Sequence, residues 1–62
     1  MWTVVYISSN QKEAEVIRKL LNEEGLLVKL RGIGLPNPVS HSVEILVPES
    51  EVDEAMEIIN SR

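Results

Sequence analysis

The stretch S-S-N-Q-K-E-A-E-V-I-R-K-L-L-N-E-E-G, residues 8–25, decides the fold. Asn10 and Glu13 form an N-x-x-E capping arrangement, in which the Asn10 side chain accepts from a free N–H at the helix start. Gly25 ends the helix, because glycine enters the left-handed conformation without steric cost. The apolar residues between these signals recur at helical spacing: Ala14, Ile17, Leu20 and Leu21. Glu15 and Lys19 stand at the spacing of an i,i+4 ion pair.

Strands are predicted on both sides of this helix. Residues 2–7 are β-branched and aromatic, which is typical of a strand. Residues 26–33 and 42–47 alternate between apolar and polar positions, so each strand has one buried face. Pro48 ends the last strand because it has no N–H to donate to a neighbouring strand. Ser50 is the expected N-cap of a second helix, whose apolar stripe is Val52, Ala55, Met56 and Ile59.

The order of these elements is β-α-β-β-α, within one domain that spans residues 1–62. The first β-α-β unit is long enough for a right-handed crossover, which makes its two strands parallel. The last two strands form an antiparallel hairpin. These connections predict an α+β fold with sheet order 1-3-2 and both helices on one face. The result is a two-layer sandwich, a ferredoxin-like fold without its last strand.

The opposite face of the sheet is then left without helices. Alternation places Leu27, Lys29 and Arg31 there from one strand, with Ser42, Glu44 and Leu46 from the next. For the first strand the pattern is ambiguous, and we assign Trp2, Val4 and Tyr6 to this face. A contiguous apolar patch on a small protein marks an interaction site. We therefore expect self-association through Trp2, Val4, Tyr6, Leu27 and Leu46, as a dimer, with a trimer formed through strand edges as the alternative.

Composition restricts the remaining classes of function. The chain has 62 residues, no cysteine and one histidine, which excludes disulfides and thiolate metal sites and disfavours a structural zinc site. Its net charge is −4, and residues 32–62 carry six acids against one base, which disfavours nucleic acid as a partner. The apolar start is too short for a secretory signal or a membrane span, so we expect a cytoplasmic protein without membrane contact.

The segment G-I-G-L-P-N-P-V-S-H-S, residues 32–42, joins the last two strands. Its two glycines resemble the start of a dinucleotide-binding fingerprint, but no helix follows to hold a pyrophosphate. Its Ser-His-Ser sequence lacks a recognisable orienting acid, and we expect no enzyme activity and no cofactor. We interpret the segment as a proline-stiffened loop that meets a partner or a small anionic effector. The candidate contact residues are Lys29, Arg31, Gly34, Leu35, Pro36, Asn37 and His41.

The chain also resembles a known family. The residues that carry the resemblance are Asn10 with Glu13-Ala14-Glu15, Glu24-Gly25, Val47-Pro48-Glu49 and Glu54-Ala55. This pattern resembles small prokaryotic proteins described as signal-transducing proteins with a domain of unknown function. That family is similar in fold to the nitrogen-regulatory PII proteins, whose long loop between strands 2 and 3 docks onto targets.

The resemblance implies a bacterial, PII-like regulatory domain, although the matching residues are mainly structural signals. In PII proteins a glycine-rich, basic loop after strand 3 helps to bind nucleotides. Here the corresponding segment is Pro48-Glu49-Ser50-Glu51, which has no glycine, lysine or arginine. PII-type ATP binding is therefore not expected. The expected function is a non-catalytic regulatory or interaction domain that presents residues 32–42 to a partner. The alternative is a module that binds a small anionic effector or a nucleotide at a subunit interface.

Overall fold

A computed structural model describes residues 1–34 and 41–62 of the chain. Its elements follow the order expected from the sequence. They are β1 (Trp2–Ser8), α1 (Gln11–Glu23), β2 (Lys29–Gly34), β3 (His41–Pro48), the short 3-10 helix η1 (Glu49–Glu51) and α2 (Val52–Asn60). The strand that we predicted from residue 26 begins only at Lys29, and Leu26–Val28 lead into it.

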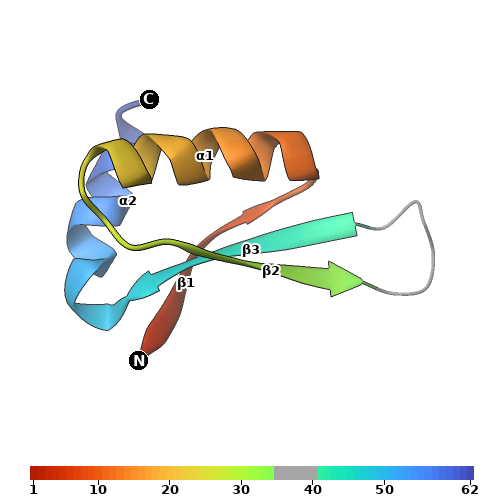
Figure 1. The fold of residues 1–62 in the computed structure, drawn as a ribbon, viewed down its shortest axis with the longest axis horizontal. Coiled ribbons are helices and arrows are strands. Elements are labelled where there is room, and N and C mark those ends of the chain that lie inside the picture. Colours follow the sequence, from red (N-terminus) through yellow and green to blue (C-terminus); the bar gives the residue numbers. More distant parts are fainter. Residues whose placement is uncertain (35–40) are drawn as a thin grey trace.

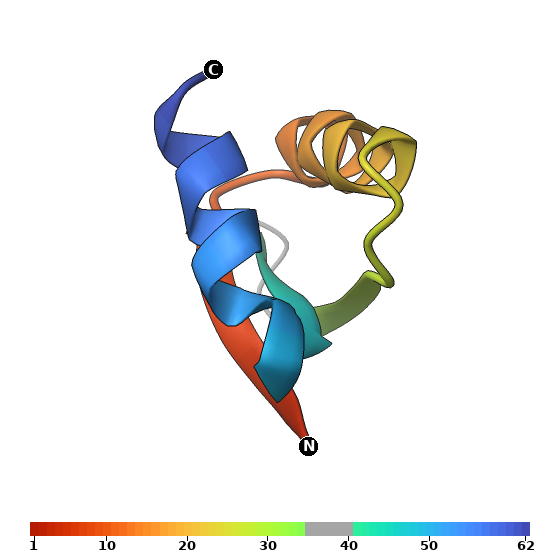
Figure 2. The same cartoon turned by 90° about the vertical axis from the view of Figure 1, so that its left-hand side faces the viewer.

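The three strands form one sheet in the order β1-β3-β2. Both β1 and β2 pair with β3 in the antiparallel sense, so β1 and β2 are parallel to each other. The two helices cover the same side of this sheet (Figures 1 and 2). The predicted α+β architecture, with its 1-3-2 strand order, is therefore confirmed.

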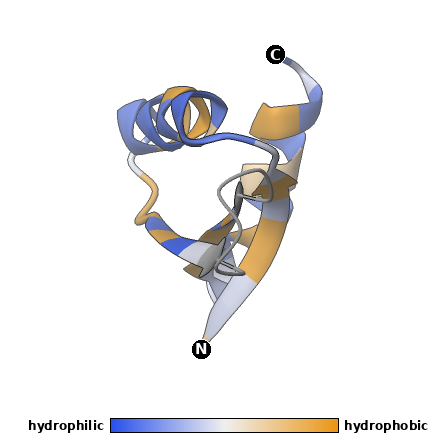
Figure 3. Cartoon of the chain, turned by 90° about the vertical axis from the view of Figure 1, so that its right-hand side faces the viewer, coloured by the Kyte–Doolittle hydropathy of each residue, from blue (hydrophilic) through white to orange (hydrophobic). Residues whose placement is uncertain are grey.

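The hydrophobic core lies between the sheet and the two helices. Its buried members are Val5, Ala14, Ile17, Leu21, Leu26, Val43, Ile45, Val47, Ala55 and Ile59. Ala14 and Ala55 are fully buried, and their small side chains let each helix approach the sheet closely. The rest of α1 is largely hydrophilic, with apolar residues at intervals (Figure 3). This amphipathic pattern explains why α1 presents one face to the sheet and the other to water.

The first turn of α1 is held by two side chains. The Asn10 side-chain oxygen accepts a hydrogen bond of 2.7 Å from the Glu13 N–H, as the capping arrangement predicts. Ser8, the only buried polar residue among those described, lies beside this turn. Its hydroxyl is 2.8 Å from both the Asn10 carbonyl oxygen and the Glu13 carboxylate, and it accepts from the Asn10 N–H. Ser8 thus stands between the two residues that a capping box joins directly.

Gly25 ends α1 in the manner expected. Its φ of 87° lies in the left-handed region. The Gly25 N–H donates to the Asn22 carbonyl at 2.9 Å, and the Leu26 N–H donates to the Leu21 carbonyl at 3.1 Å. This pair of bonds is a Schellman motif, and the buried side chains of Leu21 and Leu26 supply its usual apolar contact.

Replacing Gly25 with alanine is expected to destabilise the fold by about 1–2 kcal/mol, the cost of a left-handed conformation in an L-residue. A Cβ atom at Gly25 meets no other atom within 4 Å, so the cost is conformational rather than steric. Gly32→Ala is the matched control, because Gly32 also has open space for a Cβ but no left-handed backbone. Urea unfolding measures both changes. Equal losses of stability in the two variants would contradict this account of the helix end.

The start of α2 differs from the prediction. Ser50 lies inside the 3-10 helix η1 and makes no capping hydrogen bond, and the N-cap position of α2 belongs to Glu51. The Glu51 carboxylate instead accepts from the Leu27 N–H at 3.1 Å, which ties the segment before β2 to the start of α2.

Met56 is 38% exposed, whereas Ile58 packs against the core. Its position in the apolar stripe had predicted that Met56 is a core residue, and this prediction was wrong.

A β-bulge in β1 changes which side chains face the helices. Val4 pairs with Leu46 and Tyr6 pairs with Ile45, so Val5 is an extra residue in β1. Both Val5 and Tyr6 therefore pack against the helix-side core. The alternation resumes out of phase, and Ile7 takes the outward position opposite Glu44. Our assignment of Tyr6 to the helix-free face was wrong, because simple alternation across residues 2–7 cannot include an inserted residue.

Candidate functional site

The helix-free face of the sheet has an exposed apolar column along β1. The column consists of Trp2, Val4 and Ile7, whose exposed fractions are 43%, 36% and 57%. Trp2 and Val4 were expected on this face, whereas Ile7 replaces Tyr6 because of the bulge. Among the side chains whose exposure the structure describes, these three form a row along one edge of the sheet. We call these three residues the β1 column.

Leu46 lies beside the β1 column but contributes little surface. It is opposite Val4 on one side and Lys29 on the other, and only 4% of it is exposed. It does not belong to the core cluster beneath the helices. The Lys29 ammonium lies 5.8 Å from the centre of the Trp2 ring, a cation–π distance. Because Trp2 and Lys29 belong to strands on opposite sides of β3, their side chains meet across the central strand. Leu46 is therefore part of this face but not an exposed contact residue.

A salt bridge lies in the row of residues that crosses the helix-free face from Ile7 through Glu44 to Arg31. Arg31 and Glu44 are directly opposite each other in the β2–β3 register. The Arg31 Nε donates to a Glu44 carboxylate oxygen. The Glu44 side chain is mostly covered, with 14% exposed, whereas 60% of the Arg31 side chain is exposed. Ile7 flanks Glu44 on the other side, so this row runs from an apolar to a basic residue.

The acids of the protein are distributed away from this face. Glu44 is the only one of the ten Asp and Glu residues that belongs to a strand. The others lie in the helices, in η1 or in the turn at Glu24. Since Glu44 pairs with Arg31, Lys29 leaves the strands of the helix-free face with a small positive charge on a protein whose total charge is −4.

The remaining predicted contact residues are only partly placed. Gly34 ends β2 and pairs with His41, the first residue of β3. Leu27 is 63% exposed just before β2, as expected. Leu35, Pro36 and Asn37 lie outside the described residues. Lys29 and Arg31 belong to the same strand, but each is already in contact with a neighbouring side chain, Trp2 and Glu44 respectively.

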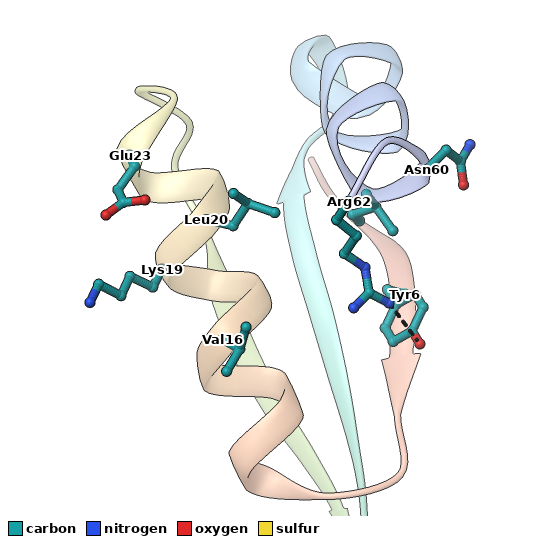
Figure 4. A pocket seen from close by; sticks show the side chains of 8 residues that line it. Tyr6, Val16, Lys19, Leu20, Glu23, Asn60 and Arg62 are labelled. Atoms are coloured by element: carbon teal, nitrogen blue, oxygen red, sulfur yellow. Dashed lines mark hydrogen bonds between the residues drawn. The ribbon is translucent and has the colours of Figure 1, made fainter.

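A groove on the opposite side of the molecule was not anticipated from the sequence. It has a volume of about 820 Å³ and lies between α1, the end of α2 and β1 (Figure 4). Val16 and Leu20 face it from α1, and Tyr6 faces it from β1. Ile59, Asn60 and Arg62 line it from the end of the chain, with Lys19 and Glu23 at its rim. The bulge at Val5 is what turns Tyr6 toward this groove.

Arg62 covers Tyr6 at the open side of this groove. The guanidinium carbon of Arg62 is 5.3 Å from the centre of the Tyr6 ring. One of its terminal nitrogens donates to the Tyr6 hydroxyl at 3.2 Å (Figure 4). In the part of the chain that the structure describes, no side-chain carboxylate forms a salt bridge with Arg62. The groove therefore combines apolar walls with one guanidinium that lacks a described acidic partner.

The outer face of α1 carries a local ion pair. Arg18 donates from two nitrogens to the Glu15 carboxylate, at 3.0 and 3.2 Å. Hydrogen bonding and charge attraction from Arg18 lower the pKa of Glu15, and the same contacts raise the pKa of Arg18. The spacing had suggested that Glu15 pairs with Lys19 at i+4. In the structure Glu15 pairs instead with Arg18 at i+3. Both groups are solvent-exposed, so this pair is a stabilising feature of a helix surface, not a binding site.

Among residues 1–34 and 41–62, no group of three or more potential metal ligands lies together. Neither α1 nor α2 has the length and apolar character to cross a bilayer. Comparison of the chain with family models, curated proteins and solved structures gives no match. Two surfaces of the protein carry features suited to binding, the helix-free face with its β1 column and the groove beside Tyr6 and Arg62.

Proposed function

We propose that this protein is a small non-catalytic interaction domain that associates with a second copy of itself through the helix-free face. The observation that supports this proposal best is the β1 column, in which Trp2, Val4 and Ile7 stay exposed on a sheet face without helices. Exposed apolar residues that are contiguous on a small domain mark contact surfaces. The helix-free face would contact the second copy, while the hydrophobic core on the helix side of the sheet would stay unchanged.

Charge favours a second copy as the occupant of this face. Two copies that met through η1 and α2, which carry five acids and no base, would bring like charges together. The helix-free face instead holds one ion pair, Arg31 with Glu44, and Lys29 beside the Trp2 ring. A twofold axis would place one β1 column on the other without opposing any pair of acids.

The available area limits the strength of this association. A stable interface buries about 800 Å² on each partner. The whole protein exposes 4294 Å², so such an interface would use close to a fifth of its surface. That fraction requires most of the helix-free face. We therefore expect a concentration-dependent dimer rather than a permanent one.

The segment of residues 32–42 was expected to be a loop, but β2 runs to Gly34 and β3 begins at His41, so only residues 35–40 lie between the two strands. We propose that it offers a second contact to a partner protein, as its proline and glycine content indicates. Residues 35–40 lie outside the described part of the chain, so this role rests on sequence alone. Replacing residues 35–40 with a two-residue Asn-Gly turn, which can join the paired ends Gly34 and His41, is expected to abolish binding to such a partner in a pull-down while preserving the β1 column.

The alternative is a module for an anionic effector that uses Lys29, Arg31 and His41. The geometry supports this role less well. Arg31 uses only its Nε toward Glu44, so its terminal nitrogens could meet an anion, but the Glu44 carboxylate beside them repels a negatively charged ligand.

Replacing Ile7 with lysine is expected to weaken self-association by about tenfold or more, because a charge would be buried at the contact. Lysine suits the fold, since position 7 is exposed and opposite Glu44. Sedimentation velocity over a concentration series measures the change.

The matched control for this experiment is Val16→Lys. Val16 is 59% exposed, slightly more than Ile7, but it lies on α1 away from the helix-free face. It adds the same charge and should leave self-association unchanged. If Val16→Lys and Ile7→Lys shifted the equilibrium equally, net charge rather than the β1 column would control association, and the proposal would fail.

A further inference from the structure

The geometry of the groove between α1 and α2 points to a binding site for a carboxylate on a hydrocarbon body. This inference is independent of the proposed self-association, because the groove and the β1 column lie on opposite sides of the sheet. The volume of about 820 Å³ falls within the usual range for small-molecule sites.

The walls of the groove select an apolar body. Val16 is a large apolar residue that remains 59% exposed on a helix whose other apolar residues are mostly covered. Leu20 stands one turn further along α1 and also faces the gap (Figure 4). Ile59 completes the lining from α2. A hydrocarbon chain between these three side chains would remove apolar surface from water on both sides.

The open side of the groove selects an anion. Arg62 has five N–H donors, of which one is directed to the Tyr6 hydroxyl. The others have no described carboxylate partner. A ligand carboxylate can accept two parallel hydrogen bonds from one guanidinium, and the Tyr6 hydroxyl can donate a third. Lys19 and Glu23 also line the groove from α1, but their charged ends point away from Arg62 and Tyr6 (Figure 4).

The bulge in β1 supplies an independent reason to regard this groove as a built feature. In a regular strand Val5 would pair with Ile45, and alternation would then carry Tyr6 to the helix-free face and leave this end of the groove without a phenol. Bulges commonly redirect a side chain next to a functional site. Here the redirected side chain is the one that Arg62 contacts.

The test is a titration of isotope-labelled protein with octanoate, below its micelle concentration, followed by amide and methyl NMR shifts. Acetate and 1-octanol serve as probes of the charge and of the hydrocarbon separately. We expect saturable shifts at Val16, Leu20 and Ile59 with octanoate. Acetate and 1-octanol should each bind more weakly than octanoate. Arg62→Gln should weaken octanoate binding by about tenfold, since it removes a charge-assisted contact. Tyr6→Phe should weaken it less.

Arg18→Gln is the matched control, because it removes the same charge from α1 outside the groove, where Arg18 pairs with Glu15. It should leave the affinity for octanoate unchanged. Equal affinity for octanoate and 1-octanol, or equal effects of Arg62→Gln and Arg18→Gln, would overturn the carboxylate assignment. Shifts confined to Trp2, Val4 and Ile7 would overturn the groove itself, as would an unchanged spectrum.

Discussion

Replacing Ile17 with alanine is expected to destabilise the protein by about 2–5 kcal/mol, the usual cost of a large-to-small change in a core. Ile17 is fully buried at the centre of the contact between α1 and the sheet. A domain of this size has a total stability of about 3–9 kcal/mol. The loss is a large fraction of that stability, so the urea midpoint, followed by circular dichroism, should fall steeply.

Val16→Ala is the control for this change on the same helix. Val16 is 59% exposed, so its loss should alter the free energy of unfolding by no more than about 0.5 kcal/mol. A similar loss in both variants would mean that α1 does not face the sheet as described here.

Replacing Ser8 with alanine is expected to cost about 1–3 kcal/mol, although only one oxygen atom is removed. The Ser8 hydroxyl is buried and lies between the Asn10 backbone and the Glu13 carboxylate. Without it, the Asn10 N–H and the Glu13 carboxylate lose a partner at the start of α1. Urea unfolding of the purified variant measures the loss.

Ser9→Ala provides the comparison, since Ser9 is exposed and adjacent. It should change stability by no more than about 0.5 kcal/mol. If Ser8→Ala proved equally neutral, the Ser8 hydroxyl would not stabilise the helix start through its hydrogen bonds to Asn10 and Glu13, and this account would be contradicted.

Most of the fold could be predicted because its signals are local. The cap at Asn10 and the stop at Gly25 depend on backbone groups within a few residues, and both are observed. Ser50 was misassigned because a 3-10 helix precedes α2. The contact that accompanies this start, from the Leu27 N–H to Glu51, joins residues 24 positions apart. A contact of that kind leaves no periodic trace in the sequence.

The candidate site was less predictable for the same reason. Val4, Val5 and Tyr6 are all good strand residues, so nothing in their types marks Val5 as the inserted one. The insertion exchanges Tyr6 for Ile7 on the helix-free face and also creates one end of the groove. Leu46 was correctly assigned to the helix-free face, but it was expected to be an exposed contact residue and is only 4% exposed, because its cover depends on both flanking strands.

The most direct test of the proposed function is an isotope-filtered NOE experiment on a mixture of labelled and unlabelled protein, at a concentration where sedimentation detects a dimer. Only contacts between two copies give signals in this experiment. We predict intermolecular NOEs from Trp2, Val4 and Ile7, and none from Val16 or Leu20. NOEs confined to α1 and α2, or a single monomeric species up to millimolar concentration, would contradict the assignment of the helix-free face as the interaction surface.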